Sequence, residues 1–269
     1  MLAPPVPPAL RPYVASRIPY DVDFGAPGVH RGLPDTTITV VLPLDTPLSV
    51  SWGSGEERRT TWSSLSGLHT EPAAIHHDGH QAGIQLALTL AGARAVLGLP
   101  AAELAGALTD LDEAVPGLAS VPERLHDLDQ WSDRVALVDR TLADLLARHG
   151  DARPRAEVGH ALAALTRGAR VEEVADEVGY SRRRLTELVR AECGVPPKAY
   201  QRIARFRASR DRLVADPAAP LADVAADSGY SDHAHLTREW AALAGCTPTA
   251  WLREEFPFVQ APEAADAEG

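Results

Sequence analysis

Two short stretches of the chain carry side chains of the types that recognise the edges of DNA bases. Arginine can form paired hydrogen bonds with guanine, threonine and glutamate can form single ones with other bases, and alanine can contact the thymine methyl group. If both stretches are helical, residues opposite the apolar positions Leu185 and Leu236 point to solvent. The candidate base contacts are then Arg183, Thr186, Glu187 and Arg190 in the first stretch, and His233, Ala234, Thr237 and Arg238 in the second.

The net charge of the whole chain hides a basic segment, so the charge is considered separately for each part of the sequence. The formal net charge is −11, yet residues 178–213 hold ten basic residues against three acidic ones. A local basic stripe is the electrostatic footprint that DNA needs. Contacts to phosphates position a protein on DNA without reading its sequence, and the candidates for this role are Arg182, Arg184, Lys198, Arg202 and Arg205.

The elements that would position these residues occur twice. The sequence Val-Glu-Glu-Val-Ala-Asp-Glu-Val-Gly-Tyr-Ser at 171–181 returns as Leu-Ala-Asp-Val-Ala-Ala-Asp-Ser-Gly-Tyr-Ser at 221–231, which indicates one supersecondary unit used twice. In each copy an apolar stripe predicts a helix, a glycine ends it, and a serine caps the next helix. Those turn and cap residues are Gly179 and Ser181, then Gly229 and Ser231. Each copy therefore predicts a helix-turn-helix unit, and residues 197–213 predict the helix that connects them.

A particular set of residues recurs through both units and the connecting helix. It comprises Ala175, Gly179-Tyr180-Ser181, Leu185, Gly194-Val195-Pro196-Pro197, Tyr200, Arg205-Phe206-Arg207-Ala208, Ala225, Gly229-Tyr230-Ser231, Leu236, Arg238, Trp240, Gly245, Pro248 and Trp251. With this set the region resembles the DNA-binding domain of the AraC/XylS family of bacterial transcription regulators. The resemblance implies two recognition helices in successive major-groove segments of double-stranded DNA. It also implies a cytoplasmic regulator with no enzymatic activity and no cofactor.

Glu187 departs from that family, in which a basic or amide residue is common at this position. Two roles stay open for it. Its carboxylate could accept a hydrogen bond from a cytosine amino group, or it could orient Arg183 or Arg190.

The part of the chain ahead of the repeat predicts an α+β fold. Residues 1–35 are rich in proline and predict an extended lead-in. Residues 36–90 contain β-branched and alternating runs typical of a small antiparallel sheet or partial barrel, and Asp78-Gly79 is a hairpin signal within them. Residues 91–150 predict helices, because apolar residues there recur at helical spacing.

These patterns divide the chain into three parts. Residues 1–150 would form an N-terminal sensor or dimerisation domain, residues 151–256 an all-α domain with tandem helix-turn-helix units, and residues 257–269 a disordered acidic tail. Asp151–Pro154 would be the linker. The segments His30–Asp35 and Gln81–Pro100 also resemble the sensor regions of actinobacterial AraC-type regulators, which implies a regulatory role without naming an effector.

A group of histidines supports a different class of function, a metal-binding or enzymatic N-terminal module fused to a degenerate DNA-binding domain. His69, His76, His77 and His80 lie close together in the sequence, and imidazole is a common zinc ligand. Adjacent residues on a strand point to opposite faces, however, so His76 and His77 are not expected to share a metal. The sequence therefore favours polar hairpin residues over a metal site.

Other classes find little support in the sequence. It has no run of eighteen apolar residues, no signal-peptide pattern at its beginning, and no nucleophile elbow or phosphate-binding loop. Cys193 and Cys246 occupy equivalent repeat positions and predict small buried residues at helix ends. Three partners besides DNA stay open. They are RNA polymerase, an unidentified small-molecule effector, and a second copy of the chain paired through residues 132–150 or the sheet.

Overall fold

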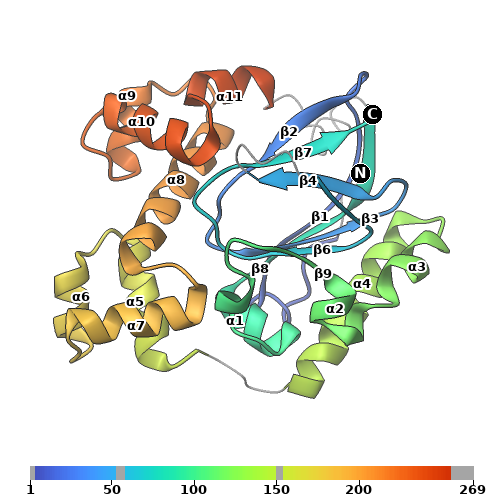
Figure 1. Cartoon of the computed structure of the whole chain (residues 1–269), viewed down its shortest axis with the longest axis horizontal. Coiled ribbons are helices and arrows are strands. Elements are labelled where there is room, and N and C mark those ends of the chain that lie inside the picture. The colour runs from blue at the N-terminus through green and yellow to red at the C-terminus, as the bar shows by residue number, and fades with distance from the viewer. Residues whose placement is uncertain (1–3, 53–57, 150–153, 256–269) are drawn as a thin grey trace.

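The computed structural model describes residues 4–52, 58–149 and 154–255, and shows two stacked antiparallel sheets beside two groups of helices (Figure 1). The larger sheet has the strand order β1-β8-β3-β6-β9 and the smaller one the order β2-β7-β4-β5. The strands are β1 (Val14–Asp23), β2 (Gly28–Gly32), β3 (Ile38–Pro43), β4 (Leu48–Trp52), β5 (Arg59–Thr61), β6 (Ser64–Ser66), β7 (Ala73–His77), β8 (His80–Leu88) and β9 (Leu108–Asp110). The expected α+β class and antiparallel pairing are confirmed.

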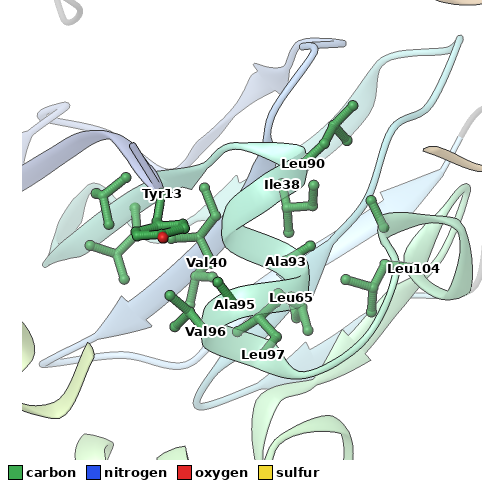
Figure 2. Packing of buried hydrophobic residues seen from close by; sticks show 14 of the residues in the cluster. Tyr13, Ile38, Val40, Leu65, Leu90, Ala93, Ala95, Val96, Leu97 and Leu104 are labelled. Carbon is green, nitrogen blue, oxygen red and sulfur yellow. The ribbon is translucent and has the colours of Figure 1, made fainter. Parts of the chain in front are cut away.

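The helices that follow cover one face of the larger sheet. They are α1 (Leu90–Gly92), the π-helical turn η1 (Ala93–Leu97), the 3-10 turns η2 (Ala101–Leu104) and η3 (Pro116–Leu118), α2 (Leu111–Ala114), α3 (Val121–His126) and α4 (Trp131–His149). Alternate residues of the strands, such as Ile38 and Val40 of β3, pack against Ala93 and Val96 of η1 (Figure 2). The period of two along each strand sends one set of side chains into this core.

Residues 4–35 differ from the extended lead-in that the sequence predicted for residues 1–35, because they contain β1 and β2. Pro19 lies within β1, where it would normally interrupt a sheet. β1 is an edge strand, however, and pairs only with β8. A proline can occupy an edge strand, because the hydrogen bond that it cannot donate is not required there.

The Asp78-Gly79 turn also differs from its prediction. The strands on either side, β7 and β8, do not pair with each other: β7 lies in the smaller sheet and β8 in the larger. Gly79 has a φ of 118° and its carbonyl accepts a hydrogen bond from the amide of Phe24 at 2.7 Å. A local turn signal shows that the chain bends, whereas strand pairing depends on the neighbours in the folded sheet.

The C-terminal part is entirely helical. Its helices are α5 (Ala156–Thr166), α6 (Val171–Glu177), α7 (Arg182–Cys193), α8 (Pro197–Ala215), α9 (Leu221–Asp227), α10 (His233–Ala244) and α11 (Pro248–Glu254). In Figure 1, α8 joins one group formed by α5, α6 and α7 to a second formed by α9, α10 and α11. None of the helices in the described parts of the chain is long and apolar enough to cross a lipid bilayer. Residues 151–153 of the expected linker at 151–154 and the tail at 257–269 lie outside the described residues.

Candidate nucleic-acid interface

The first helix-turn-helix unit consists of α6 and α7 and forms for the local reasons that the sequence gives. Val174 and Ala175 are buried on α6, and Gly179 turns the chain with a φ of 73°. The amide of Tyr180 returns to the carbonyl of Ala175 at 2.8 Å. The hydroxyl of Ser181 accepts from the amide of Arg184 at 3.2 Å, which satisfies one free donor at the start of α7.

The second unit repeats this geometry with one change. Gly229 has a φ of 75°, and the amide of Tyr230 returns to Ala225 at 2.8 Å. The cap of α10 is Asp232, whose carboxylate accepts from the amide of His235 at 2.7 Å. The prediction that Ser231 caps this helix is therefore wrong. The second turn is one residue longer, so the next polar residue reaches the cap position, and a carboxylate is a favoured acceptor there.

The four candidate base contacts of α7 share one solvent-facing side of the helix. Arg183 is 89% exposed, and its Nε donates to Glu187 at 3.0 Å. Glu187 also accepts from Arg184 at 3.5 Å, and the hydrogen bond from Arg183 lowers the pKa of its carboxyl. Thr186 is half-buried and its hydroxyl donates to the carbonyl of Arg182, while Arg190 is exposed. This ion pair fits one of the two roles left open for Glu187, the orientation of Arg183, and both roles stay predictions.

The candidate base contacts of α10 occupy the corresponding side. His233, Ala234 and Arg238 are exposed, and the half-buried Thr237 donates from its hydroxyl to the carbonyl of His233 at 2.8 Å. Leu236 and Trp240 lie fully buried on the opposite side of the helix. In both helices, therefore, one face is polar and exposed to solvent, and the opposite face is apolar and packed in the core.

The five candidate phosphate contacts fall into two groups. Arg182, Arg184 and Lys198 are exposed around the first unit. Arg202 and Arg205 instead turn toward the second unit. Arg202 donates from Nε to Glu239 of α10 at 2.8 Å. The guanidinium of Arg205 lies 5.5 Å from the centre of the Tyr230 ring and donates to the carbonyl of Gly229 at 3.4 Å.

The basic stripe expected along α8 is largely neutralised by acidic residues that come from elsewhere in the fold. Asp35 accepts from Arg207 at 3.0 Å and from Arg210 at 2.8 Å. Thr37 steadies the same carboxylate by donating from its hydroxyl at 2.9 Å. Counting charges along the sequence missed this arrangement, because Asp35 is separated from both arginines by more than 170 residues.

The N-terminal part also holds each helix-turn-helix unit directly. Arg94 of η1 forms a two-pronged contact with Glu192 of α7, and Arg31 of β2 contacts Glu254 at 3.2 Å and Glu255 at 2.5 Å. Glu255 is buried, and burial raises the pKa of its carboxyl. No sequence motif marks these pairs, since their partners are distant in the chain.

The two units differ in whether they share a hydrophobic core with the N-terminal part. The buried residues of α5, α6 and α7 belong to the same hydrophobic cluster as the N-terminal sheet and helices. The second unit has a cluster of its own, which runs from Phe206 to Trp251. Among the described residues of the N-terminal part, Leu33 is the apolar residue that packs against this cluster. α8 contributes Ile203 to the first cluster and Phe206 to the second, so it joins two separately packed bodies.

The four histidines of the alternative metal site have separate partners. His76 hydrogen-bonds Ser51 at 3.0 Å, His77 stacks on Phe24, His69 bonds the carbonyl of Glu71, and His80 lies between Asp21 and Asp45. Hydrogen bonds that the His80 ring donates to the carboxylates of Asp21 and Asp45 raise the pKa of His80, whereas burial lowers the pKa of His69. In the described residues, no three His, Cys, Asp or Glu side chains are arranged to hold a metal.

Comparisons with known proteins bear on the same region. The family model described as a helix-turn-helix domain matches residues 174–254, from α6 to the end of α11. No curated protein matches the chain. Solved structures of ToxT from Vibrio cholerae share the fold, although the sequence identity is low. The structure from strain O395 is 9% identical, covers 88% of this chain and 96% of its own, and gives a TM-score of 0.51.

Two further ToxT structures, from strain SCE256, extend this likeness. An apo lysine-to-alanine variant is 12% identical over 88% of this chain and 97% of its own, with a TM-score of 0.54. The wild-type protein with a bound unsaturated fatty acid is 10% identical over 89% and 95%, with a TM-score of 0.52. At such identities the likeness establishes a shared fold.

The paired units, their connecting helix and the family match define a tandem helix-turn-helix DNA-binding protein. Residues 174–254 therefore belong to the helix-turn-helix family, and this part of the chain is a DNA-binding domain of that type.

Proposed function

We propose that the chain is a transcription regulator of the AraC type that reads a bipartite DNA site, with α7 and α10 in successive major-groove segments on one face of the duplex. The observation that carries the proposal is the equivalence of the two units. Each has a glycine turn with a φ near 75°, a capped second helix and a solvent-facing polar side. α8 fixes their separation because it is packed into both hydrophobic clusters.

Within this proposal the base contacts come from Arg183, Thr186, Glu187 and Arg190 of α7 and from His233, Ala234, Thr237 and Arg238 of α10. Arg183 and Arg238 are the principal ones, because both are exposed and arginine pairs best with guanine. Arg182, Arg184 and Lys198 contact phosphates. Arg202 and Arg205 would do so only after leaving Glu239 and Tyr230.

Selection of bound sequences from random DNA, with the full chain at physiological salt, tests this function. Two short conserved elements about one helical turn apart are expected. A single element would show that one unit does not read DNA. If no sequence is enriched, with or without candidate effectors, sequence-specific binding is excluded. The full chain is needed because the first unit shares its core with the N-terminal part.

We also propose that residues 1–150 regulate the DNA-binding domain, residues 151–256. The protein would act in the cytoplasm and contact RNA polymerase. The regulatory route is the set of contacts made by Arg31, Asp35 and Arg94. A homodimer would need a surface other than the apolar stripe of α4. Val135, Val138 and Leu142 of that stripe are already buried in the chain's own core.

A cavity of about 300 Å³ offers a place for a small-molecule effector. Phe24, His30 and His77 supply its aromatic side, and Arg31, Glu254 and Glu255 lie at its polar side. The ToxT fold has been solved with an unsaturated fatty acid. In this chain a carboxylate would have to displace Glu255 from Arg31, so the lining favours a neutral or cationic ligand.

The test compares an unsaturated fatty acid with the amine of equal chain length. Thermal unfolding and DNA affinity of the full chain should respond to the amine and not to the acid. A response to the acid alone would mean that Arg31 is released on binding. No response to either compound would exclude long-chain amphiphiles as effectors at this cavity.

A further inference from the structure

An open cavity of about 400 Å³ lies beside the first recognition helix. Three cationic side chains line it, and each comes from a different element. Arg170 directly precedes α6, Arg182 is the first residue of α7, and Lys198 is the second residue of α8. Thr186 lines the same cavity and also lies on the polar face of α7, so the cavity opens next to the surface that faces DNA.

The cavity keeps a net positive charge. Glu172 is the one acidic residue in its lining, and it accepts from Arg182 at 3.1 Å. Both of these side chains are about half exposed or more, and such surface pairs contribute little and exchange readily. The lining also holds two further cations, Arg170 and Lys198, and neither forms an ion pair among the described residues. Glu173, which is not in the lining, accepts from the backbone amide of Arg170 at 3.2 Å. Gln201, which also lines the cavity, donates from its side-chain amide to the carbonyl of Ala169 at 2.5 Å, and this bond ties α8 to the segment just before α6.

We propose that this cavity holds one backbone phosphate of the DNA strand that borders the segment read by α7. The inference rests on the proposed function and specifies which part of the DNA the first unit holds. Converging arginine and lysine side chains suit a phosphate, because they replace its condensed counterions and fix the register of the protein without reading bases.

The second unit has no counterpart of this phosphate clamp, which we define as Arg170, Arg182 and Lys198. In the frame of the repeat these positions correspond to Pro220, His233 and Thr249, and none of them is an arginine or lysine. The two units therefore have different tasks. The first anchors the protein on the DNA backbone and reads bases, while the second depends on base contacts.

The charge-removing variant Arg170→Gln/Lys198→Gln tests the clamp in the full chain. Its affinity for the selected site is measured over a series of salt concentrations, beside wild type and Arg140→Gln, an exposed arginine of α4 far along the chain from either unit. Loss of one phosphate contact should make the slope of log K against log salt shallower by about 0.9. The ranking of base-substituted sites should stay unchanged, and Arg140→Gln should behave as wild type.

Neutral methylphosphonate substitutions, placed one at a time along the site, locate the phosphate. One position near the first element should weaken wild-type binding and leave the double variant unaffected. If the wild type binds specifically but the double variant keeps its salt slope, or changes its base preference, the clamp is wrong and the proposed function stands. If the wild type selects no sequence, the proposed function itself fails.

Discussion

Glu192, near the end of the first recognition helix, receives a two-pronged contact from Arg94: Nε lies 2.8 Å from Oε1, and the second nitrogen lies 2.8 Å from Oε2. The Glu192 side chain is only 5% exposed. An almost fully buried carboxylate of α7 therefore depends on a residue of the N-terminal part. The first unit cannot move away from η1 without exposing or neutralising this charge.

Arg94→Ala should destabilise the full chain by about 1–3 kcal/mol, because it leaves the buried Glu192 without its partner. The free energy of unfolding in urea measures the effect. Arg94→Met/Glu192→Met should recover most of the loss, since replacing a buried pair by apolar side chains is often neutral. An equal loss in both variants would mean that packing, not charge, holds this contact.

Asp35→Asn should weaken the attachment of α8 in a pH-dependent manner. Burial raises the pKa of Asp35, but Arg210 and Arg207 outweigh it, so the pKa lies below the ordinary 3.8. A lowered folded-state pKa contributes stability above the unfolded value and loses it as the pH falls through the folded value. The difference in unfolding free energy between wild type and variant should thus be constant above about pH 5 and shrink below pH 3.8. A difference that persists at low pH would contradict the ion-pair assignment.

Gly194→Ala should separate the first unit from η2. Gly194 has a φ of 80°, and a Cβ there would lie 2.1 Å from the Cβ of Ala105. Gly179→Ala is the matched control, since its φ is 73° and its added Cβ meets nothing within 4 Å. The control should cost about 1–2 kcal/mol of backbone strain, and Gly194→Ala clearly more, measured by urea unfolding. Equal costs would show that the contact with Ala105 relaxes freely.

Asp232→Ala should cost about 0.5–2 kcal/mol through loss of the cap of α10, while Ser231→Ala should cost much less. Thermal unfolding of the two variants decides between the cap seen in the structure and the one suggested by the repeat. The reverse order of stabilities would restore Ser231 as the cap.

Arg183→Ala should weaken specific DNA binding by about 1–3 kcal/mol and relax the preference at one base position. Binding to a panel of single-base variants of the selected site measures both quantities. A uniform loss across the panel, with a shallower salt slope, would instead identify Arg183 as a phosphate contact. Glu187→Gln complements this test, because it removes the charged acceptor that holds Arg183 in the free protein.

The sequence by itself determined the helix-turn-helix units and their polar faces. Local physics is sufficient there: an apolar stripe at helical spacing, a glycine in the left-handed region and a capping side chain act within about ten residues. For the same reason the sequence predicted the buried Leu185 and Leu236 and the α+β class of the first part. It could not distinguish Ser231 from Asp232, because one added residue in a turn shifts the cap.

The tertiary structure alone decided which charges remain available for DNA. Asp35, Glu239 and Glu192 reach Arg210, Arg202 and Arg94 across long sequence separations, and an ion pair leaves no periodic trace in the chain. The same holds for Arg170, which joins Lys198 at a cavity only because α6 and α8 pack beside α7. Strand pairing was also decided by the tertiary structure, since the chain bends at Gly79 but β7 and β8 pair in different sheets.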